Sequence, residues 1–249
     1  MEQFKPSVVS LVPSLTETLI EASVKVVGRT RYCIYPEQKV QNIPVVGGTK
    51  ALKLDDIKKL NPDFVIIDQQ ENTKEMALQL ADADLKLLIT NVTSFKTVIS
   101  ALENLGEKLQ SEKLKEFAAR YQLLSSVNPT TFLQKIILKG NYQQLLADQE
   151  SAGFEYVIWK NPFMVIGPET FIFDNLKLIG IEPQHSQKYP TISDSKLMKA
   201  KCLFSSEPYP FAKKYEELCA RGFKGIVVDA EKLSWFGIRN LLFLESTQQ

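Results

Sequence analysis

Histidine and cysteine are scarce in this chain of 249 residues, which holds one histidine, His185, and three cysteines. A metal site built from several imidazoles is therefore excluded within one chain. Cys33, Cys202 and Cys219 are odd in number and far apart in the sequence, so they form neither a CxxC pair nor a disulfide framework. Reduced thiols are expected. Cysteine catalysis has no support, because His185 lies in a polar stretch with no sequence reason to approach Cys33.

The chain also lacks an excess of one charge sign and any long apolar run. Thirty basic residues face 29 acidic ones, so no overall field attracts nucleic acid, and nucleic acid is not an expected partner. The N-terminal apolar run, Val8–Val12, is shorter than the about 7–15 residues of a secretory signal and the about 20 of a membrane span. We therefore expect no membrane insertion and, for the chain as numbered, a cytoplasmic location. A periplasmic location is expected if a leader has been removed.

The chain does have a regular alternation of short apolar runs and amphipathic stretches, which is typical of βαβ units around a mostly parallel sheet. Ser7–Val12 is expected as the first strand, and Ser14 with Glu17 matches a capping box at the start of the next helix. Leu54–Asp56 predicts the opening of a short helix whose first-turn acids suit the helix dipole. Further strands of this part are expected at residues 24–27, 64–67 and 85–89.

The stretch from Ser94 to Ser126 has no proline and one glycine, Gly106, and its apolar residues recur at helical spacing. It predicts a long helical crossing that breaks near Gly106. After an ambiguous stretch at 130–151 the alternation restarts at Phe154–Trp159, with Pro168 at a first helical position and a last helix at 233–244. The predicted fold is α/β: two lobes, each a mostly parallel sheet wrapped by helices, joined by a long crossing helix. The predicted domains are 1–93, 94–127 and 128–249.

Short motifs in a fixed order carry a resemblance to a known family. They are SLVPSLTETL at 10–19, VGRTRYC at 27–33, VVGGT at 45–49, LNPDFVI at 60–66, WKNP at 159–162, SSEPYPF at 205–211 and SWFGIR at 234–239. Together they resemble the helical-backbone metal receptors, the class III substrate-binding proteins that include vitamin B12-binding and siderophore-binding proteins. The resemblance covers nearly the whole chain.

This resemblance implies an importer's substrate-binding protein that captures a cobalamin-like or iron-chelate ligand in a cleft between the two lobes. Open α/β sheets also bind ligands outside the carboxyl ends of their strands. No enzyme activity and no covalent cofactor are expected, because the sequence offers no catalytic dyad. A cytosolic carrier, a sensor, or an enzyme acting on a tetrapyrrole or metal chelate remains the alternative.

Four residues of the first lobe are candidate ligand contacts. Tyr32 offers a flat amphipathic ring for a planar ligand, although it can equally pack under a loop. Cys33 can contact a soft metal or can be a small packed residue. Glu71 and Asn72 follow the strand at 64–67, where they can bond ligand amides. Asn72 with Glu75 can also cap the next helix, and the two roles can coexist.

Five candidates come from the second half of the chain. Trp159 and Pro162 fall at the end of a strand. Glu207, in a stiff loop, can face the ligand or can pin the loop through backbone bonds. Trp235 and Arg239, four residues apart on the expected last helix, share a face and offer an aromatic surface beside a permanent cation. Their alternative roles are a core residue and a surface ion pair.

The resemblance also implies that an acidic residue of each lobe docks to an ABC permease. Asp55 lies at that place in the first lobe. In the second lobe the nearest carboxylate is Asp194, one residue from the family's position. Both acids also suit a helix start, where capping and the helix dipole favour aspartate.

Overall fold

The computed structural model describes residues 5–124, 127–148 and 151–248. The chain forms two compact units. The first comprises Met1–Leu124 together with Trp235–Leu242, and the second comprises Ser125–Ser234 together with Phe243–Gln249. Residues 125 and 126, where the sequence predicts the end of the helical crossing, lie outside the described residues. The division at residues 93 and 127 stays a prediction.

The first unit is built on a parallel sheet of four strands in the order β2-β1-β3-β4. Its elements are β1 (Ser7–Ser10), α1 (Pro13–Glu21), β2 (Lys25–Arg29), α2 (Glu37–Val40), α3 (Leu54–Leu60), β3 (Phe64–Asp68), α4 (Lys74–Ala81), β4 (Leu87–Thr90), α5 (Phe95–Lys108) and α6 (Glu112–Leu123). The neighbouring residues Val65 and Ile66 point to opposite faces of β3, and both are fully buried. Both faces of the sheet are therefore covered, as parallel sheets require.

One face of this sheet packs against α3 and α4. Val9 and Val65 of the sheet form a core with Ile57 of α3 and Leu80 of α4, and all four are fully buried. Burying an aliphatic side chain of this size stabilises a fold by about 1.5–3 kcal/mol. The predicted short helix after Lys53 is confirmed as α3, with Asp55 and Asp56 in its first turn.

Helix α1 does not begin with the predicted capping box. Val12 is its N-cap residue, no side chain caps it, and Pro13 occupies its first turn. Proline suits this position because its missing N–H would have no partner inside the helix. Ser14 and Glu17 therefore lie within the helix, and the capping prediction is wrong for both.

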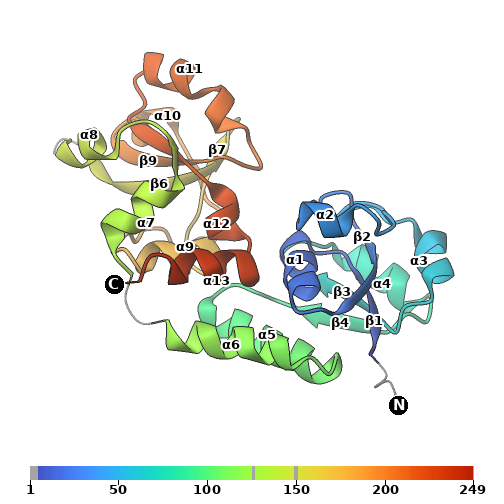
Figure 1. The fold of residues 1–249 in the computed structure, drawn as a ribbon. Helices are drawn as coiled ribbons and strands as arrows, with labels where there is room; N and C mark the ends of the chain where they lie inside the picture. The colour runs from blue at the N-terminus through green and yellow to red at the C-terminus, as the bar shows by residue number, and fades with distance from the viewer. Residues whose placement is uncertain (1–4, 125–126, 149–150, 249) are drawn as a thin grey trace. The chain divides into compact units, whose positions relative to one another are not determined.

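The predicted helical crossing is a pair of helices, α5 and α6, which lie side by side (Figure 1). The break falls at residues 109–111, where Gln110 takes a left-handed conformation with φ of 53°. The predicted break near Gly106 is confirmed to within a few residues, although Gly106 itself lies inside α5. A Cβ there would meet the Lys115 side chain of α6, so this glycine allows close helix packing.

The second unit holds a mixed sheet of six strands in the order β5-β10-β9-β6-β7-β8. Its elements are α7 (Pro129–Ile136), β5 (Ile137–Lys139), α8 (Tyr142–Ala147), β6 (Ala152–Trp159), β7 (Phe163–Val165), α9 (Phe171–Lys177), β8 (Thr191–Ile192), α10 (Asp194–Leu197), β9 (Ala200–Ser205), the 3-10 helix η1 (Phe211–Lys213), α11 (Tyr215–Ala220), β10 (Gly225–Val228) and α12 (Ala230–Ser234). The predicted α/β class with two sheets is confirmed. Parallel pairing in this sheet joins the central strands β10, β9 and β6, whereas β5, β7 and β8 pair antiparallel.

Aromatic packing fills one side of this second sheet. Phe204 of β9 and Phe211 of η1 are buried, and their ring centroids lie 5.1 Å apart. The helix that follows β7 starts later than Pro168 predicts, because the Thr170 hydroxyl accepts the Phe173 N–H and so caps α9. A threonine hydroxyl at a helix start accepts a backbone N–H, which a proline side chain cannot do.

Candidate functional site

The last predicted helix is two helices, which changes how Trp235 and Arg239 meet. Helix α12 ends at Ser234, and α13 (Ile238–Glu245) begins after Gly237, whose φ of 94° only glycine adopts readily. Trp235 therefore precedes α13, and the argument from helical spacing is wrong. The two side chains are nevertheless neighbours, with the Arg239 guanidinium carbon 5.4 Å from the centroid of the Trp235 ring.

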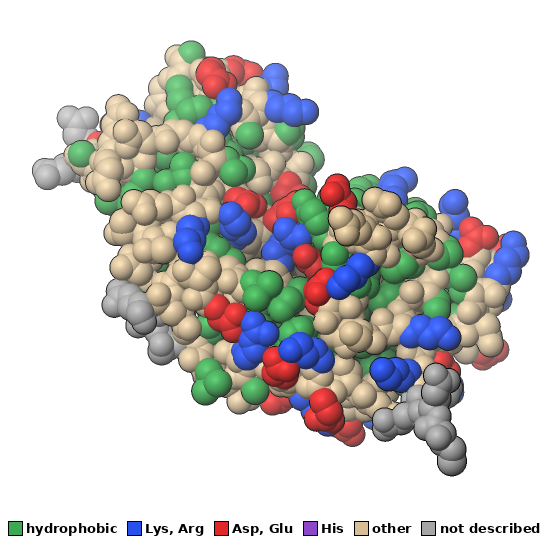
Figure 2. Space-filling view, in the orientation of Figure 1, with side chains coloured by type: hydrophobic (Ala, Val, Ile, Leu, Met, Phe, Trp, Pro, Cys, Tyr) green, Lys and Arg blue, Asp and Glu red, His purple; other side chains and the backbone are tan. Residues whose placement is uncertain are grey.

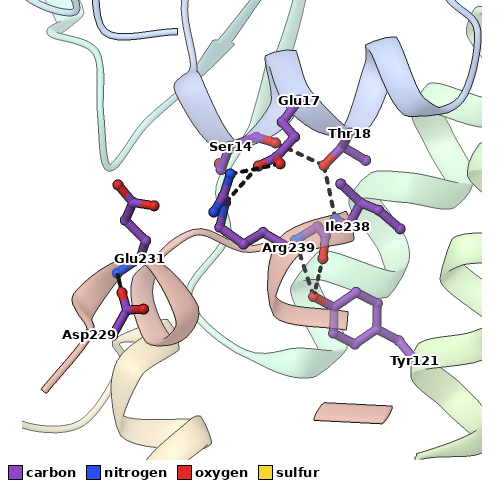
Figure 3. A network of polar contacts seen from close by, with 9 residues as sticks. Ser14, Glu17, Thr18, Tyr121, Asp229, Glu231, Ile238 and Arg239 are labelled. Atoms are coloured by element: carbon purple, nitrogen blue, oxygen red, sulfur yellow. Dashed lines mark hydrogen bonds and ion pairs between the residues drawn. The ribbon is translucent and has the colours of Figure 1, made fainter. Parts of the chain in front are cut away.

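Arg239 is the centre of a cluster in the first unit. Its Nε and Nη2 donate to the two carboxylate oxygens of Glu17 on α1, each over 2.8 Å (Figure 3). Its guanidinium carbon lies 3.8 Å from the centroid of the Tyr35 ring. The Trp235 ring meets Tyr35 edge-on, with centroids 5.7 Å apart. The cluster of Glu17, Tyr35, Trp235 and Arg239 thus combines a two-point ion pair with two aromatic rings.

The segment that presents Trp235 and Arg239 is held to the first unit by backbone hydrogen bonds. The Thr18 hydroxyl of α1 accepts the Ile238 N–H over 3.0 Å and donates to the Ser14 carbonyl over 2.8 Å (Figure 3). The buried Tyr121 hydroxyl of α6 donates to the Gly237 carbonyl over 2.8 Å and accepts the Gly237 N–H over 3.1 Å. These bonds fix the turn between the two C-terminal helices, and with it the cluster.

Glu17 and Tyr35 were not among the candidates predicted from the sequence. Pro13 could have indicated that Glu17 is available for another role. A helix that begins at this proline places Glu17 beyond its first turn, where its side chain cannot cap the helix. Tyr35 adjoins the TRYC motif, but its partner Arg239 lies near the other end of the chain. Sequence spacing therefore gave no reason to join them.

Tyr32 and Cys33 occupy the loop after β2 in opposite environments. Tyr32 is 48% exposed, and the Arg31 guanidinium carbon lies 5.0 Å from the centroid of its ring. Cys33 is fully buried, with its Sγ 3.1 Å from the hydroxyl oxygens of both Thr16 and Thr30. Burial raises the pKa of the Cys33 thiol, partly offset by these hydrogen bonds. The thiol is packed inside the unit, while the Tyr32 ring reaches solvent.

Asn72 ties together three parts of the first unit instead of capping α4. Its Oδ1 accepts the Asp68 N–H over 3.0 Å, and its Nδ2 donates to the carbonyls of Leu11 and Thr49 over 3.2 and 3.0 Å. The cap of α4 is Thr73, whose hydroxyl accepts the Met76 N–H. The predicted capping role of Asn72 is therefore wrong.

These backbone bonds occupy both ends of the Asn72 amide. A ligand bond to this amide would have to compete with them. Glu71, the adjacent candidate, is exposed at the carboxyl end of β3.

The second unit brings its three candidates to one region. Trp159, at the end of β6, is 42% exposed. Its ring meets the Tyr209 ring edge-on, with the ring centroids 5.8 Å apart. Tyr209 belongs to the loop after β9, which also carries the half-buried Glu207, whose backbone carbonyl accepts the Ser205 hydroxyl. Pro162 is exposed in the turn between β6 and β7. Trp159 and the Glu207 loop are thus neighbours through Tyr209.

The two predicted docking acids lie in different units. Asp55 is in the first turn of α3. Asp194 begins α10, and its Oδ2 lies 2.7 Å from Arg221 Nη2. The side chain of Asp194 remains 53% exposed despite this ion pair, so it is accessible to a partner.

Charge and metal ligands are dispersed in the part of the chain that the structure describes. On the face drawn in Figure 2, basic and acidic side chains are interspersed, in keeping with the formal net charge of +1. Within residues 5–124, 127–148 and 151–248, no three His, Cys, Asp or Glu residues are grouped so that they could hold a metal ion. Among the same residues, no helix combines the length and the apolar character that a membrane crossing needs.

Comparison with known proteins supports the resemblance seen in the motifs. Residues 8–124 match the family model described as periplasmic binding protein. A vitamin B12-binding protein of Salmonella typhi is 28% identical over 139 residues, which cover 52% of this chain and 52% of that protein. The match thus spans about half the length of the relative.

Solved structures extend the likeness to the whole fold. A periplasmic vitamin B12-binding protein of Vibrio cholerae has a TM-score of 0.68 at 16% identity, covering 98% of this chain and 95% of that chain. A periplasmic haem-binding protein of Pseudomonas aeruginosa has a TM-score of 0.70 at 18% identity, covering 98% and 93%. The resemblance drawn from the sequence is therefore confirmed: residues 8–124 match the periplasmic binding protein family, and the chain as a whole has the fold of these ligand-binding proteins.

Proposed function

We propose that this protein is the substrate-binding component of an ABC importer and that it reversibly binds vitamin B12 or a haem-like or other iron chelate. The observation that carries the proposal is the cluster of Tyr35, Trp235 and Arg239 in the first unit. The names of the similar proteins support the same ligand class. A periplasmic location follows from this proposal, in place of the cytoplasmic one expected for the chain as numbered.

The residues of the cluster suit a large ligand with a flat, partly apolar ring system. Tyr35 and Trp235 are half-buried, so each ring is fixed by its neighbours and still reaches the surface. Fixed aromatic side chains bury much ligand area at a low cost in conformational entropy. The exposed ring of Tyr32 adds a further surface of the same kind. Trp159, Pro162 and Glu207 remain proposed contacts from the second unit.

Capture without chemical change is proposed because the nucleophile that the sequence offered is held inert. Burial keeps the Cys33 thiol protonated by raising its pKa, and a thiol, unlike a thiolate, is a poor nucleophile. His185 pairs with Glu155 of the second unit, their Nε2 and Oε2 atoms lying 2.7 Å apart. These contacts give both groups structural partners.

Equilibrium titration with cyanocobalamin, haem and a ferric siderophore tests the proposal. We expect one of the three to bind with a dissociation constant of about 1 μM or lower, the range in which a few well-placed anchors outweigh the cost of association. Mass analysis of the recovered ligand should show it unchanged. Failure of all three ligands to bind, or recovery of altered ligand beyond one equivalent of protein, would refute the proposed function.

Docking to the importer's permease is proposed through Asp55 and Asp194. Reversing both charges (Asp55→Lys with Asp194→Lys) should abolish capture of an ABC permease from host membranes at low salt and leave the ligand dissociation constant within about twofold. Wild-type capture should fall as salt rises, because exposed charges are screened beyond about 10 Å at 0.1 M salt. Pull-down with mass-spectrometric identification of the permease measures this.

Asp56→Lys is the matched control for docking. Asp56 follows Asp55 on the same helix, and its Oδ1 lies 3.7 Å from Lys59 Nζ. The control should capture the permease as the wild type does. If the wild-type protein captures no permease at low salt, or if the control loses capture as completely as the double variant, docking through these two acids is wrong.

A further inference from the structure

We propose that Glu17 sets the charge selectivity of the ligand site, so that the site favours a ligand whose rim carries uncharged amides over one whose rim carries carboxylates. This inference rests on the proposed function and deepens it, because it distinguishes between the ligand classes that the proposal leaves open. Its basis is the two-point ion pair in which the Glu17 carboxylate accepts two hydrogen bonds from the Arg239 guanidinium.

The ion pair uses the guanidinium in the same way that a ligand carboxylate would. Nε and Nη2 of Arg239 each donate to a different oxygen of Glu17 over 2.8 Å. This fork-to-fork geometry is the strongest that arginine makes with a carboxylate. The Nε/Nη2 edge of the guanidinium is therefore already filled by the protein's own carboxylate, and a ligand carboxylate can take that edge only by displacing Glu17.

Burial makes the exchange of one carboxylate for another costly. The side chains of Glu17 and Arg239 are 13% and 23% exposed, so water screens their attraction only in part. A ligand that displaced Glu17 would leave its carboxylate poorly solvated beside a second negative charge. A ligand that left the pair intact would bring its own negative charge close to Glu17. Both routes disfavour an anionic rim.

The two aromatic rings and the ion pair together form a polarisable surface on which the positive charge of Arg239 is balanced. Tyr35 covers the guanidinium at 3.8 Å from its ring centroid to the guanidinium carbon, and Trp235 lies at 5.4 Å. The positive charge of Arg239 is thus shared between Glu17 and these two rings. A neutral ring ligand can stack on the aromatic surface, and its amides can donate to the carboxylate oxygens without breaking the pair.

Two matched pairs of ligands separate the effect of charged groups around the edge of the ligand ring from the effect of the shape of the ring. Cyanocobalamin is compared with its monocarboxylic acid, in which one propionamide has become a propionate, and haem dimethyl ester is compared with haem. In each pair we expect the wild-type protein to favour the uncharged member. Glu17→Gln keeps the size of the side chain and removes its charge, so it should shift each affinity ratio toward the carboxylate by about tenfold or more at low salt.

Glu21→Gln is the control, because it makes the same change one turn further along α1. Glu21 lies at the surface and pairs with Lys39 over 2.8 Å, away from Arg239. It should leave both affinity ratios within about twofold of the wild type, since exposed ion pairs act weakly at a distance. Arg31, the cation beside Tyr32, is the same in all variants, so the comparison isolates Glu17.

The outcomes separate this inference from the proposed function. If no wild-type dissociation constant for the four ligands falls below about 100 μM, the inference is refuted, and the proposed function is refuted with it unless the ferric siderophore of the first titration binds. If ligands bind but Glu17→Gln leaves the ratios unchanged, or shifts them no more than Glu21→Gln does, the inference alone is refuted. A wild-type preference for the carboxylate member of each pair also refutes it. A shift confined to Glu17→Gln that shrinks as salt rises supports it.

Discussion

Replacing Gly237 with alanine is expected to destabilise the first unit by about 2–5 kcal/mol and to abolish ligand binding. At φ of 94° an alanine costs about 1–2 kcal/mol in backbone strain alone. Its Cβ would also overlap the Thr18 hydroxyl, and overpacking of this kind adds about 1–3 kcal/mol. Because Gly237 and Thr18 hold the segment that carries Trp235 and Arg239, the site should be lost with it.

Urea denaturation followed by tryptophan fluorescence measures this effect. The chain has two tryptophans: Trp159→Phe leaves Trp235 as the reporter of the first unit, and Trp235→Phe leaves Trp159 as the reporter of the second unit, which contains Gly222. Gly222→Ala is the matched control, because its φ of 90° carries the same backbone strain while no atom lies within 4 Å of the added Cβ. It should cost about 1–2 kcal/mol, the strain alone.

A second variant isolates the contact with Thr18. Combining Thr18→Ala with Gly237→Ala removes the overlap, so the double variant should lose less stability than the sum of the two single losses. Equal losses from Gly237→Ala and Gly222→Ala, or strict additivity in the double variant, would show that the Thr18 contact is not what confines this turn to glycine.

The alternation of strands and helices was predictable because it rests on local patterns. The predicted strand at Phe154–Trp159 lies within β6 and ends at the same residue, and the strand at 64–67 differs from β3 by one residue. Apolar runs of this length between turn residues are a direct consequence of burial on both faces of a sheet. Local pattern therefore fixed the α/β class.

The short elements of the second unit were not predictable in the same way. Strands β7 and β8 have 3 and 2 residues, too few to show a period. The ambiguous stretch at 130–151 contains α7, β5 and α8, and β5 is an antiparallel edge strand of three residues. Tertiary pairing, not local sequence, decides such segments, and it makes this sheet mixed.

The candidate site shows the same limit more sharply. Arg239 was a candidate from the sequence, but its partner Glu17 lies 222 residues away, and nothing in the local pattern joins them. The prediction of a continuous last helix was wrong because the chain turns at Gly237. An isolated glycine in an apolar pattern is only a weak indicator of such a break. The chemistry of single residues was predictable, whereas their pairing required the fold.

Trp235→Ala is expected to weaken ligand binding by about thirtyfold, or about 2 kcal/mol, which is typical of the loss of an aromatic anchor. Trp235 gives a cleaner test than Arg239, because Arg239→Ala would leave the Glu17 carboxylate, 13% exposed, without its guanidinium partner. Removing the Trp235 ring leaves both hydrogen bonds of that ion pair in place. Calorimetric titration measures the change, and circular dichroism with urea denaturation checks the fold.

Two further variants decide what a loss at Trp235 means. Trp235→Phe keeps an aromatic ring beside Tyr35, so it should retain affinity within about fivefold of the wild type if ring stacking binds the ligand. Tyr189→Ala removes an exposed ring of the second unit, 45% accessible, that is not proposed as a ligand contact, and it should change nothing. If Trp235→Ala binds like the wild type, the ring does not touch the ligand. If it unfolds the first unit while Trp235→Phe folds and binds normally, the ring serves the core, and the lost binding does not identify Trp235 as a ligand contact.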